Sequence, residues 1–350
     1  MVSPGAVFLK DYKPDSELIT PAHRIKKPAC PVIDIHTHFG AKYRSEPFET
    51  RYCANRVYHF LKGKGIEKAV SLPLFPGLPY VREREKTSPL GSFLYHFAPI
   101  DASSLGQRDF EQCVRRQFEC FDTEGISGIK IWKDLAFQTK AKGKRIFLSD
   151  PSLCVIWEEA AARGWPVLIH AADPPAYFKY PTLQNERMEE LQAMPKWCYA
   201  QDPAISFQAL MEQQEQLICT HKDTRFIIAH MGSWPSNLRQ VAKWLDIYPN
   251  MYIDTAACLS ELGRQPYTAA GFFRKYQDRI LFGTDYFAGE PDSYETWYRF
   301  LETQDEYFPH APQAFPWGGR WNIYGIGLSK EVLEKVYYKN ACTLFRSYEP

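Results

Sequence analysis

Two histidines one residue apart, His36 and His38, end an apolar run that begins at Val32. Successive side chains of a β-strand point to opposite faces, so these two imidazoles should lie on the same face. Zinc and related cations accept neutral imidazole as a ligand. The spacing therefore predicts a pair of metal ligands, although two ordinary strand histidines would give the same pattern.

Three later apolar runs also end in a residue that could bind or assist a metal, namely Val167–His170, Phe226–His230 and Ile280–Asp285. A catalytic zinc site combines imidazole and carboxylate ligands and keeps one position open for water or substrate. Taken singly, His170 could be a solvated strand end, His230 the start of a loop, and Asp285 a helix N-cap. Their equivalent places along the chain favour one shared site.

Eight apolar segments are typical of buried strands: Val32–His38, Ala69–Phe75, Phe93–Asp101, Gly128–Trp132, Val167–Ala171, Arg225–His230, Met251–Thr255 and Ile280–Tyr286. Helical patterns lie between them, most clearly at Asp109–Asp122, Ser152–Arg163, Ile205–His221, Pro235–Tyr248 and Pro266–Gln277. This alternation predicts an α/β fold with a parallel sheet. We expect a (β/α)8 TIM barrel rather than an open doubly wound sheet, because only closure brings the ligands of the first and last strands together.

Composition points to a large enzyme that acts on small molecules. The chain has 350 residues, of which 45% are hydrophobic, and its net charge is +1. A near-neutral charge gives no global field that would attract nucleic acid or an anionic membrane, so we expect a small-molecule substrate. A homo-oligomer is compatible with the sequence. Nine cysteines without a Cys-x-x-Cys pair favour a reducing compartment, so we predict a cytoplasmic protein.

We divide the chain into an N-terminal arm, residues 1–30, and one barrel domain, residues 31–350. The arm lacks the apolar core of a secretory signal and should lie over the fold, or add a short strand at the barrel bottom. No stretch approaches the roughly 20 consecutive apolar residues of a membrane-spanning helix. Three long loops after strands should select the substrate: Phe39–Thr50, Ala172–Asp202 and Phe287–Gly327.

Four motifs occur in order: Asp34–His38, Ala229–Gly232, Arg279–Asp285 and Tyr338–Ala341. With them the chain, from Val32 to Phe345, resembles the amidohydrolase superfamily, in particular the amidohydrolase-related branch that includes aminocarboxymuconate semialdehyde decarboxylase. The resemblance implies that a divalent metal, most often zinc, is held by His36, His38, His170 and Asp285. His230 would stand beside the metal-bound water.

In that arrangement Asp285 could also accept a proton from the water, which a bound cation acidifies toward neutral pH. His230 could orient the water or polarise a substrate oxygen, and could pass a proton to the leaving group. These two residues are therefore the predicted catalytic groups.

Lys130 decides between one metal and two. It lies on the fourth predicted strand, where some superfamily members carry a carboxylated lysine that bridges two metals. A strand that continues through Trp132 would leave the ammonium deep in the barrel, with Asp34 as a candidate partner. We therefore favour one ion, with a second only if Lys130 is carboxylated.

Asp34 should point inward. It could support the ligands through hydrogen bonds or be an unrelated buried carboxylate, and Asp254 has the same two interpretations.

The leading hypothesis is a metal-dependent hydrolase whose metal-activated water attacks an amide, lactone or related ester. The alternative is a nonoxidative decarboxylase, a carbon–carbon lyase, acting on a small unsaturated or aromatic carboxylic acid. The complete ligand set argues against a third class, a noncatalytic binding barrel. Trp132 and Arg320 are candidate substrate contacts; Arg320 could bind a carboxylate bidentately or pair with a protein acid.

Overall fold

A nine-stranded parallel sheet forms the centre of the computed structural model, which describes residues 16–42, 52–311, 315 and 317–345. The sheet order is β10-β9-β8-β7-β4-β3-β2-β1-β11. Its strands are β1 (Val32–His38), β2 (Ile66–Ser71), β3 (Leu94–Pro99), β4 (Gly128–Ile131), β7 (Val167–Ile169), β8 (Phe226–Ile228), β9 (Met251–Asp254), β10 (Ile280–Leu281) and β11 (Tyr286–Phe287). Residues 1–15 of the predicted arm, 43–51 in and after the first predicted loop, and 346–350 of the predicted domain lie outside the described residues.

The sheet closes because one segment pairs with both of its ends. The predicted strand Ile280–Tyr286 is split into β10, which pairs with β9, and β11, which pairs with β1. Between these two strands, the Ile35 amide donates to the carbonyl oxygen of Phe282, and the Asp285 amide donates to that of His36, each at 2.9 Å. The predicted (β/α)8 barrel is confirmed, and the open sheet is excluded.

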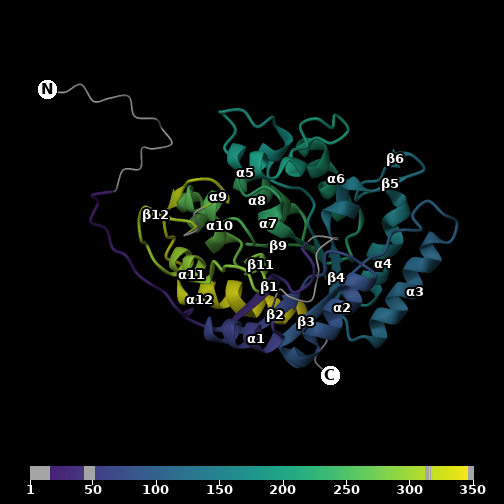
Figure 1. Ribbon diagram of the computed structural model, residues 1–350, viewed down its shortest axis with the longest axis horizontal. Helices are drawn as coiled ribbons and strands as arrows, with labels where there is room; N and C mark the ends of the chain where they lie inside the picture. Colours follow the sequence, from purple (N-terminus) through teal and green to yellow (C-terminus); the bar gives the residue numbers. More distant parts are fainter. Residues whose placement is uncertain (1–15, 43–51, 312–314, 316, 346–350) are drawn as a thin grey trace.

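Helices cover the outside of the strands (Figure 1). The longer ones are α1 (Ala54–Gly63), α2 (Leu78–Thr87), α3 (Phe110–Thr123), α4 (Cys154–Ala162), α6 (Phe207–Thr220), α8 (Leu238–Ile247), α10 (Pro266–Lys275) and α11 (Tyr294–Glu302). Shorter ones are α5 (Met188–Ala193), α7 (Ala229–Gly232), α9 (Leu259–Gly263), α12 (Lys330–Glu334) and α13 (Asn340–Phe345), the last two joined by a π-helical turn. Two small hairpins, β5 (Lys140–Ala141) with β6 (Lys144–Arg145) and β12 (Phe308–Pro309) with β13 (Asn322–Ile323), decorate the loops.

Two apolar layers hold the barrel together. One large cluster includes outward-facing strand residues, such as Ile129 and Val167, together with helix residues. A second cluster contains the alternate strand residues, such as Leu168 and Ile227, which therefore fill the barrel interior. Residues of α13, including Phe345, belong to this second cluster and close it off.

A β-bulge in β1 overturns the expected direction of Asp34. The register between β1 and β2 shifts between Asp34 and Thr37. Such a bulge adds one residue to the strand, so the side chains before it and after it no longer alternate between the two faces in one unbroken series. The Asp34 carboxylate accepts hydrogen bonds from Thr284 and, at 2.8 Å, from the Tyr294 hydroxyl in α11. The prediction that Asp34 points inward was therefore wrong: it lies on the helix-facing side of β1.

The predicted ends of several strands were also wrong, among them those of β2 and β8. β2 begins three residues before the predicted Ala69 and ends at Ser71, because Pro73 and Pro76 cannot donate to a sheet. β8 ends at Ile228 rather than His230, because His230 and Met231 have positive φ angles and turn the chain into α7.

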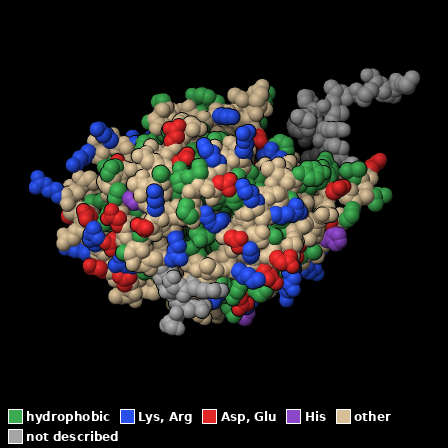
Figure 2. Space-filling view, turned by 180° about the vertical axis from the view of Figure 1, so that it is seen from behind, with side chains coloured by type: hydrophobic (Ala, Val, Ile, Leu, Met, Phe, Trp, Pro, Cys, Tyr) green, Lys and Arg blue, Asp and Glu red, His purple; other side chains and the backbone are tan. Residues whose placement is uncertain are grey.

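The described part of the arm lies along α11 without forming a helix or strand over residues 16–31. The Ala29 amide donates to Glu302, and Arg24 pairs with Glu295. None of the helices in the described residues has the length and apolar character needed to cross a bilayer. Basic and acidic side chains are interspersed over the face shown in Figure 2, in keeping with the small net charge.

The motif residue Asn340 joins α13 to the beginning of β10. Its side-chain amide donates to the carbonyl oxygens of Gln277 and Ile280, both at 2.7 Å. Asn340→Ala should lower the free energy of unfolding by roughly 1–3 kcal/mol, because it leaves these oxygens without a donor. Urea denaturation measures this. Thr343→Ala, an exposed change on the same helix, should cost much less, and equal losses would contradict the structural role.

Candidate metal centre

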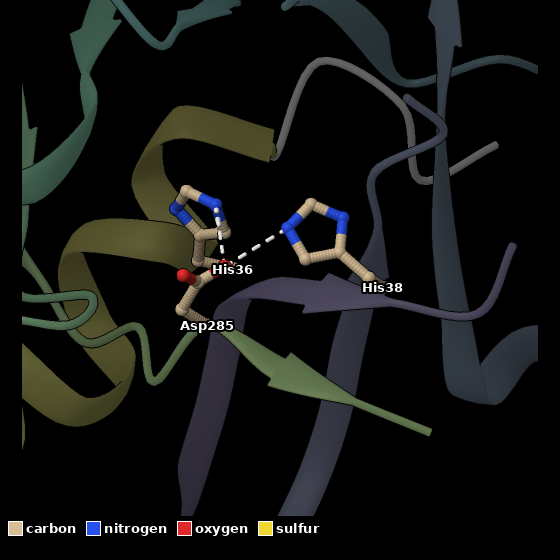
Figure 3. Close-up of side chains that lie close together, drawn as sticks. All are labelled: His36, His38 and Asp285. Atoms are coloured by element: carbon tan, nitrogen blue, oxygen red, sulfur yellow. Dashed lines mark hydrogen bonds and ion pairs between the residues drawn. The ribbon is translucent and has the colours of Figure 1, made fainter. Parts of the chain in front are cut away.

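Three predicted ligands meet where β1 and the segment between β10 and β11 cross. Nε2 of His38 lies 3.0 Å and Nε2 of His36 lies 3.5 Å from the same carboxylate oxygen, Oδ1 of Asp285 (Figure 3). Potential ligand atoms of these three residues lie within 4.8 Å of one another. His36 and His38 are buried, whereas the Asp285 side chain keeps 29% of its surface exposed, so the group can be reached from one side.

Both imidazoles have a hydrogen-bond acceptor at the nitrogen that faces away from Asp285. Nδ1 of His36 lies 2.7 Å from Oδ2 of Asp254, and Nδ1 of His38 lies 2.7 Å from the carbonyl oxygen of Leu72. Burial lowers the pKa of both histidines below the ordinary value, so each carries one N–H at neutral pH. With that hydrogen donated to Asp254 or Leu72, Nε2 of each ring presents a lone pair.

This arrangement fits a cation. With the rings in these tautomers, two lone pairs and one carboxylate oxygen converge, which is unfavourable unless a positive charge lies among them. Nε2 of His36 is buried and has no hydrogen-bond partner in the part of the chain that the structure describes. Imidazole and carboxylate are the donors that zinc and similar divalent ions take.

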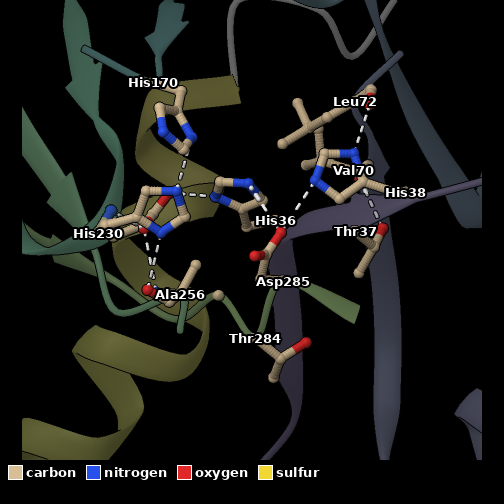
Figure 4. A network of polar contacts seen from close by, with 12 residues as sticks. His36, Thr37, His38, Val70, Leu72, His170, His230, Ala256, Thr284 and Asp285 are labelled. Carbon is tan, nitrogen blue, oxygen red and sulfur yellow. Dashed lines mark hydrogen bonds and ion pairs between the residues drawn. The ribbon is translucent and has the colours of Figure 1, made fainter. Parts of the chain in front are cut away.

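His170 and His230 lie next to this trio (Figure 4). Nε2 of His230 lies 3.0 Å from Nδ1 of His170, and the ring centroid of His230 lies 5.1 Å from that of His36. The other His170 nitrogen, Nε2, lies 3.0 Å from Oδ1 of Asp173. The structure thus brings His170 against His230 and Asp173, and it is not part of the ligand group that His36, His38 and Asp285 form among the described residues.

The row of contacts that runs through His170 and His230 has one hydrogen fewer than it needs when both rings are neutral. Nδ1 of His230 lies 2.9 Å from the carbonyl oxygen of Ala256, so the row runs from this oxygen through both rings to Asp173. Its three contacts need three hydrogens, whereas two neutral imidazoles carry two. Burial lowers the pKa of His170 to about 4, which disfavours an extra proton there. A bound cation would supply the missing charge.

Asp173 is a residue that the sequence analysis missed. Burial alone would raise its pKa, but Lys133, at 2.9 Å, and His170 outweigh this effect and hold the carboxyl ionised. The Tyr199 hydroxyl donates to it at 2.6 Å. An acidic residue three positions after a predicted ligand was the available signal.

Asp254, left open by the sequence analysis, contacts both halves of the site. Besides His36, it accepts the backbone N–H of His230 at 2.8 Å. Burial raises its pKa, while that N–H donor and the Lys130 ammonium favour the ionised form. We assign the ionised form, since all its hydrogen-bond contacts are with N–H groups.

Unusual backbone conformations gather at the same strand ends. Seven described residues other than glycine have positive φ angles, and five of them follow β8, β9 or β10: His230, Met231, Ser233, Ala257 and Asp285. Such conformations are unfavourable for residues with a Cβ and tend to cluster at functional sites. Asp285 is followed by β11, so the interpretation of this residue as a helix N-cap was wrong.

The sequence analysis suggested Asp34 as a partner of Lys130, but the two residues do not pair. Its ammonium is buried and has no hydrogen-bond partner among the described residues. Burial lowers its pKa to about 8, against the opposing charges of Asp254 and Asp285. β4 ends at Ile131, one residue before the predicted end, so Lys130 lies close to the strand end and to the metal trio.

The two candidate substrate residues lie in different surroundings. Trp132 contacts His170 edge to face, with 4.8 Å between ring centroids, and so borders the site. Arg320 forms an exposed pair with Glu189, so its contact is the protein acid that was the alternative to a substrate carboxylate.

The loops after β7 and β11 are tied together by a buried ion group. Arg187, on the first loop, pairs with Glu190 at 3.0 Å and with Glu261 of α9. Glu190 in turn accepts the backbone N–H of Gly318, on the second loop. The two long loops that should select the substrate therefore hold each other in place.

Gly283 lets the closing segment pass close to the site. A Cβ at this position would lie 2.8 Å from Cβ of His36. Gly283→Ala should lower the free energy of unfolding by roughly 1–3 kcal/mol, because a methyl group must be forced into packed surroundings. Denaturation in urea measures the loss. Gly271→Ala, in α10 with open space at its Cβ, should instead stabilise the protein slightly, and a similar loss in both variants would contradict this account.

Glu83 is a buried carboxyl behind the loop that follows His38. It accepts a 2.5 Å hydrogen bond from the Ser71 hydroxyl, and burial raises its pKa from 4.5 to about 7. The folded protein therefore binds a proton more tightly than the unfolded chain does. Stability from this group is present below pH 4.5 and is lost as the pH rises toward 7.

Glu83→Gln should remove this loss, by about 1.4 kcal/mol for each unit of pKa difference. Unfolding free energies measured between pH 5 and pH 8 should show that the advantage of the variant grows with pH. Glu85→Gln, an exposed change on the same helix, is the control. A pH-independent difference would show that Glu83 is ionised in the fold.

Comparison with solved structures supports the barrel and, at these identities, shows the fold alone. A TIM-barrel protein from Bordetella bronchiseptica has 13% identity and a TM-score of 0.56, with 91% of this chain and 99% of that chain covered. A 2,6-dihydroxybenzoate decarboxylase from Rhizobium has 15% identity, a TM-score of 0.55 and the same coverage. A dihydroxybenzoic acid decarboxylase from Polaromonas with bound manganese has 15% identity and a TM-score of 0.55, covering 92% and 98%.

The sequence comparisons give the family. No curated protein sequence matches the chain significantly. The profile of the amidohydrolase family matches residues 103–347, well over half of the chain. The match includes Lys130, His170, His230 and Asp285, and it bears out the resemblance drawn from the motifs. This protein belongs to the amidohydrolase family.

Proposed function

We propose that this protein is a metal-dependent hydrolase that uses an activated water on an amide, lactone or related ester of a small molecule. The observation that carries the proposal is the convergence of ligand atoms from His36, His38 and Asp285. These residues would hold one divalent ion, with His170 as the further predicted ligand. Zinc suits this donor set, and manganese, present in one structural neighbour, is the other candidate.

A bound divalent ion supplies a Lewis acid that polarises a substrate oxygen and lowers the pKa of water. The carboxylate of Asp285 holds a negative charge on the exposed side of the site, where it can accept a proton. His230 presents Nε2 toward His170 while its Nδ1 is held by Ala256. Nε2 of His230 is therefore the atom that would exchange a proton with the reacting group.

A cavity of about 420 Å3 beside the site suits a small substrate. Lys130 and Trp132 line it together with apolar residues such as Leu74 and Ile100 and charged ones such as Asp101 and Asp134. Trp132 also contacts His170, which connects the cavity wall with the proposed centre. An apolar or aromatic substrate body would lie against this indole.

Decarboxylation is the second candidate, and the buried ammonium of Lys130 favours it. A buried ammonium without a hydrogen-bond partner among the described residues is costly, and a substrate carboxylate would compensate it. Two of the three structural neighbours named above are decarboxylases by name. The substrate in this case would be a small unsaturated or aromatic carboxylic acid. Carboxylation of Lys130 itself is the remaining use of the group, and it would permit a second ion.

Elemental analysis and a substrate panel test the proposal. We expect about one divalent ion per chain after purification without added metal, and turnover of a lactone, amide or ester that chelation abolishes and metal restores. Release of carbon dioxide from an unsaturated or aromatic acid would select the lyase instead. Two ions per chain would indicate carboxylated Lys130, and far less than one would reject a metal centre.

Asp285→Asn should reduce turnover by at least about 100-fold and lower metal content, because the amide is a poorer ligand and cannot take a proton. Asp278→Asn, which changes a surface pair with Lys335 at the start of the same segment, is the matched control and should keep both. Near-normal turnover of Asp285→Asn would reject the role of Asp285.

A further inference from the structure

The end of β9 supplies no predicted metal ligand, yet it contacts both His36 and His230. Asp254 is fully buried. Its Oδ2 lies 2.7 Å from Nδ1 of His36, and its Oδ1 accepts the backbone N–H groups of His230, at 2.8 Å, and Ala256, at 3.1 Å. One carboxylate thus joins a predicted ligand from β1 to the predicted proton-transfer residue that follows β8.

We infer that Asp254 is a positioning residue that keeps the metal-binding nitrogen of His36 free of hydrogen and holds His230 in place. This inference rests on the proposed cation site. Asp254 need not touch the substrate or the ion to act in this way.

The first part of the role follows from imidazole chemistry. A neutral imidazole has one N–H, and the acceptor beside one nitrogen decides where that hydrogen lies. Asp254 is the acceptor at Nδ1 of His36, so Nε2, which faces Asp285, is left bare. A hydrogen bond from behind also fixes the ring orientation of a metal-binding histidine.

The second part concerns the turn after β8. His230 and Met231 have φ angles of 55° and 53°, which residues with a Cβ rarely adopt. The backbone N–H of His230 is held by Asp254, the last residue of β9, and its ring is held by the carbonyl oxygen of Ala256, two residues beyond that strand. The conformation of His230 therefore depends on the end of β9.

Asp254 could itself be considered a ligand, because potential ligand atoms of His36, His230 and Asp254 also lie within 4.8 Å of one another. Both of its carboxylate oxygens, however, already face N–H groups. In the group formed by His36, His38 and Asp285, the converging nitrogens carry no hydrogen. This difference favours a supporting role for Asp254 and a binding role for Asp285.

Asp254→Asn tests the inference with little change of shape. Either the side-chain NH2 faces Nδ1 of His36, which moves the imidazole hydrogen to Nε2, or it faces the backbone N–H groups of the turn. We expect cobalt(II) affinity, measured from visible absorption during titration, to fall about 10- to 100-fold. Affinity within threefold of the unchanged protein would overturn the inference.

Asp34→Asn is the matched control. Asp34 is equally buried, and it contacts His36 through the backbone N–H and not through the ring, while its other hydrogen bonds come from Thr284 and Tyr294. Its replacement should lower the urea midpoint while cobalt affinity changes by less than threefold. Equal loss of affinity in both variants would show that any buried carboxylate removed from this region disturbs the centre, and would also overturn the inference.

Nitrogen-15 NMR of histidine-labelled, metal-free protein tests the same point without a variant, in case Asp254→Asn does not fold. His36, assigned by its loss in His36→Gln, should carry its hydrogen on Nδ1. A hydrogen on Nε2 would overturn the inference. Absence of cobalt binding by the unchanged protein would instead reject the proposed function, so the two failures are distinguishable.

Discussion

Closure of the barrel by the segment between β9 and α11 is the constraint on which the site depends. The segment pairs with β9 through β10 and with β1 through β11, and two backbone hydrogen bonds bridge the interval between these strands. This interval contains Gly283 and Asp285 and runs directly beside His36. If the segment paired only on one side, residues about 250 positions apart could not contribute to one centre.

The placement of hydrogens is as important as the placement of heavy atoms. Acceptors behind His36 and His38 take one hydrogen from each ring, so that the nitrogens facing Asp285 are bare. One of these acceptors is a backbone carbonyl oxygen and the other is a side chain. The centre therefore combines one support that no substitution can remove with one that a single substitution can.

The fold and the members of the site could be predicted largely from the sequence, because apolar strands that end in ligand-type residues make a strong local pattern. Val32–His38 was predicted with its observed bounds. The directions of side chains were harder to predict. The bulge in β1 turns Asp34 to the helix side, and sequence gives no sign of a bulge that depends on pairing with β2. The positions of Asp173 and of the ion group of Arg187 depend on how loops fold, and loops lack the periodic sequence pattern that marks helices and strands.

The buried ion group of Arg187 has a consequence for how the loops of this protein could change. Arg187 and Glu190 come from the loop after β7, Glu261 from α9, and the bound amide of Gly318 from the loop after β11. Exchanging one of these loops for that of a relative would leave a buried charge without its ion-pair partner. A loop exchange, whether by recombination or by protein engineering, would therefore have to replace all three segments together.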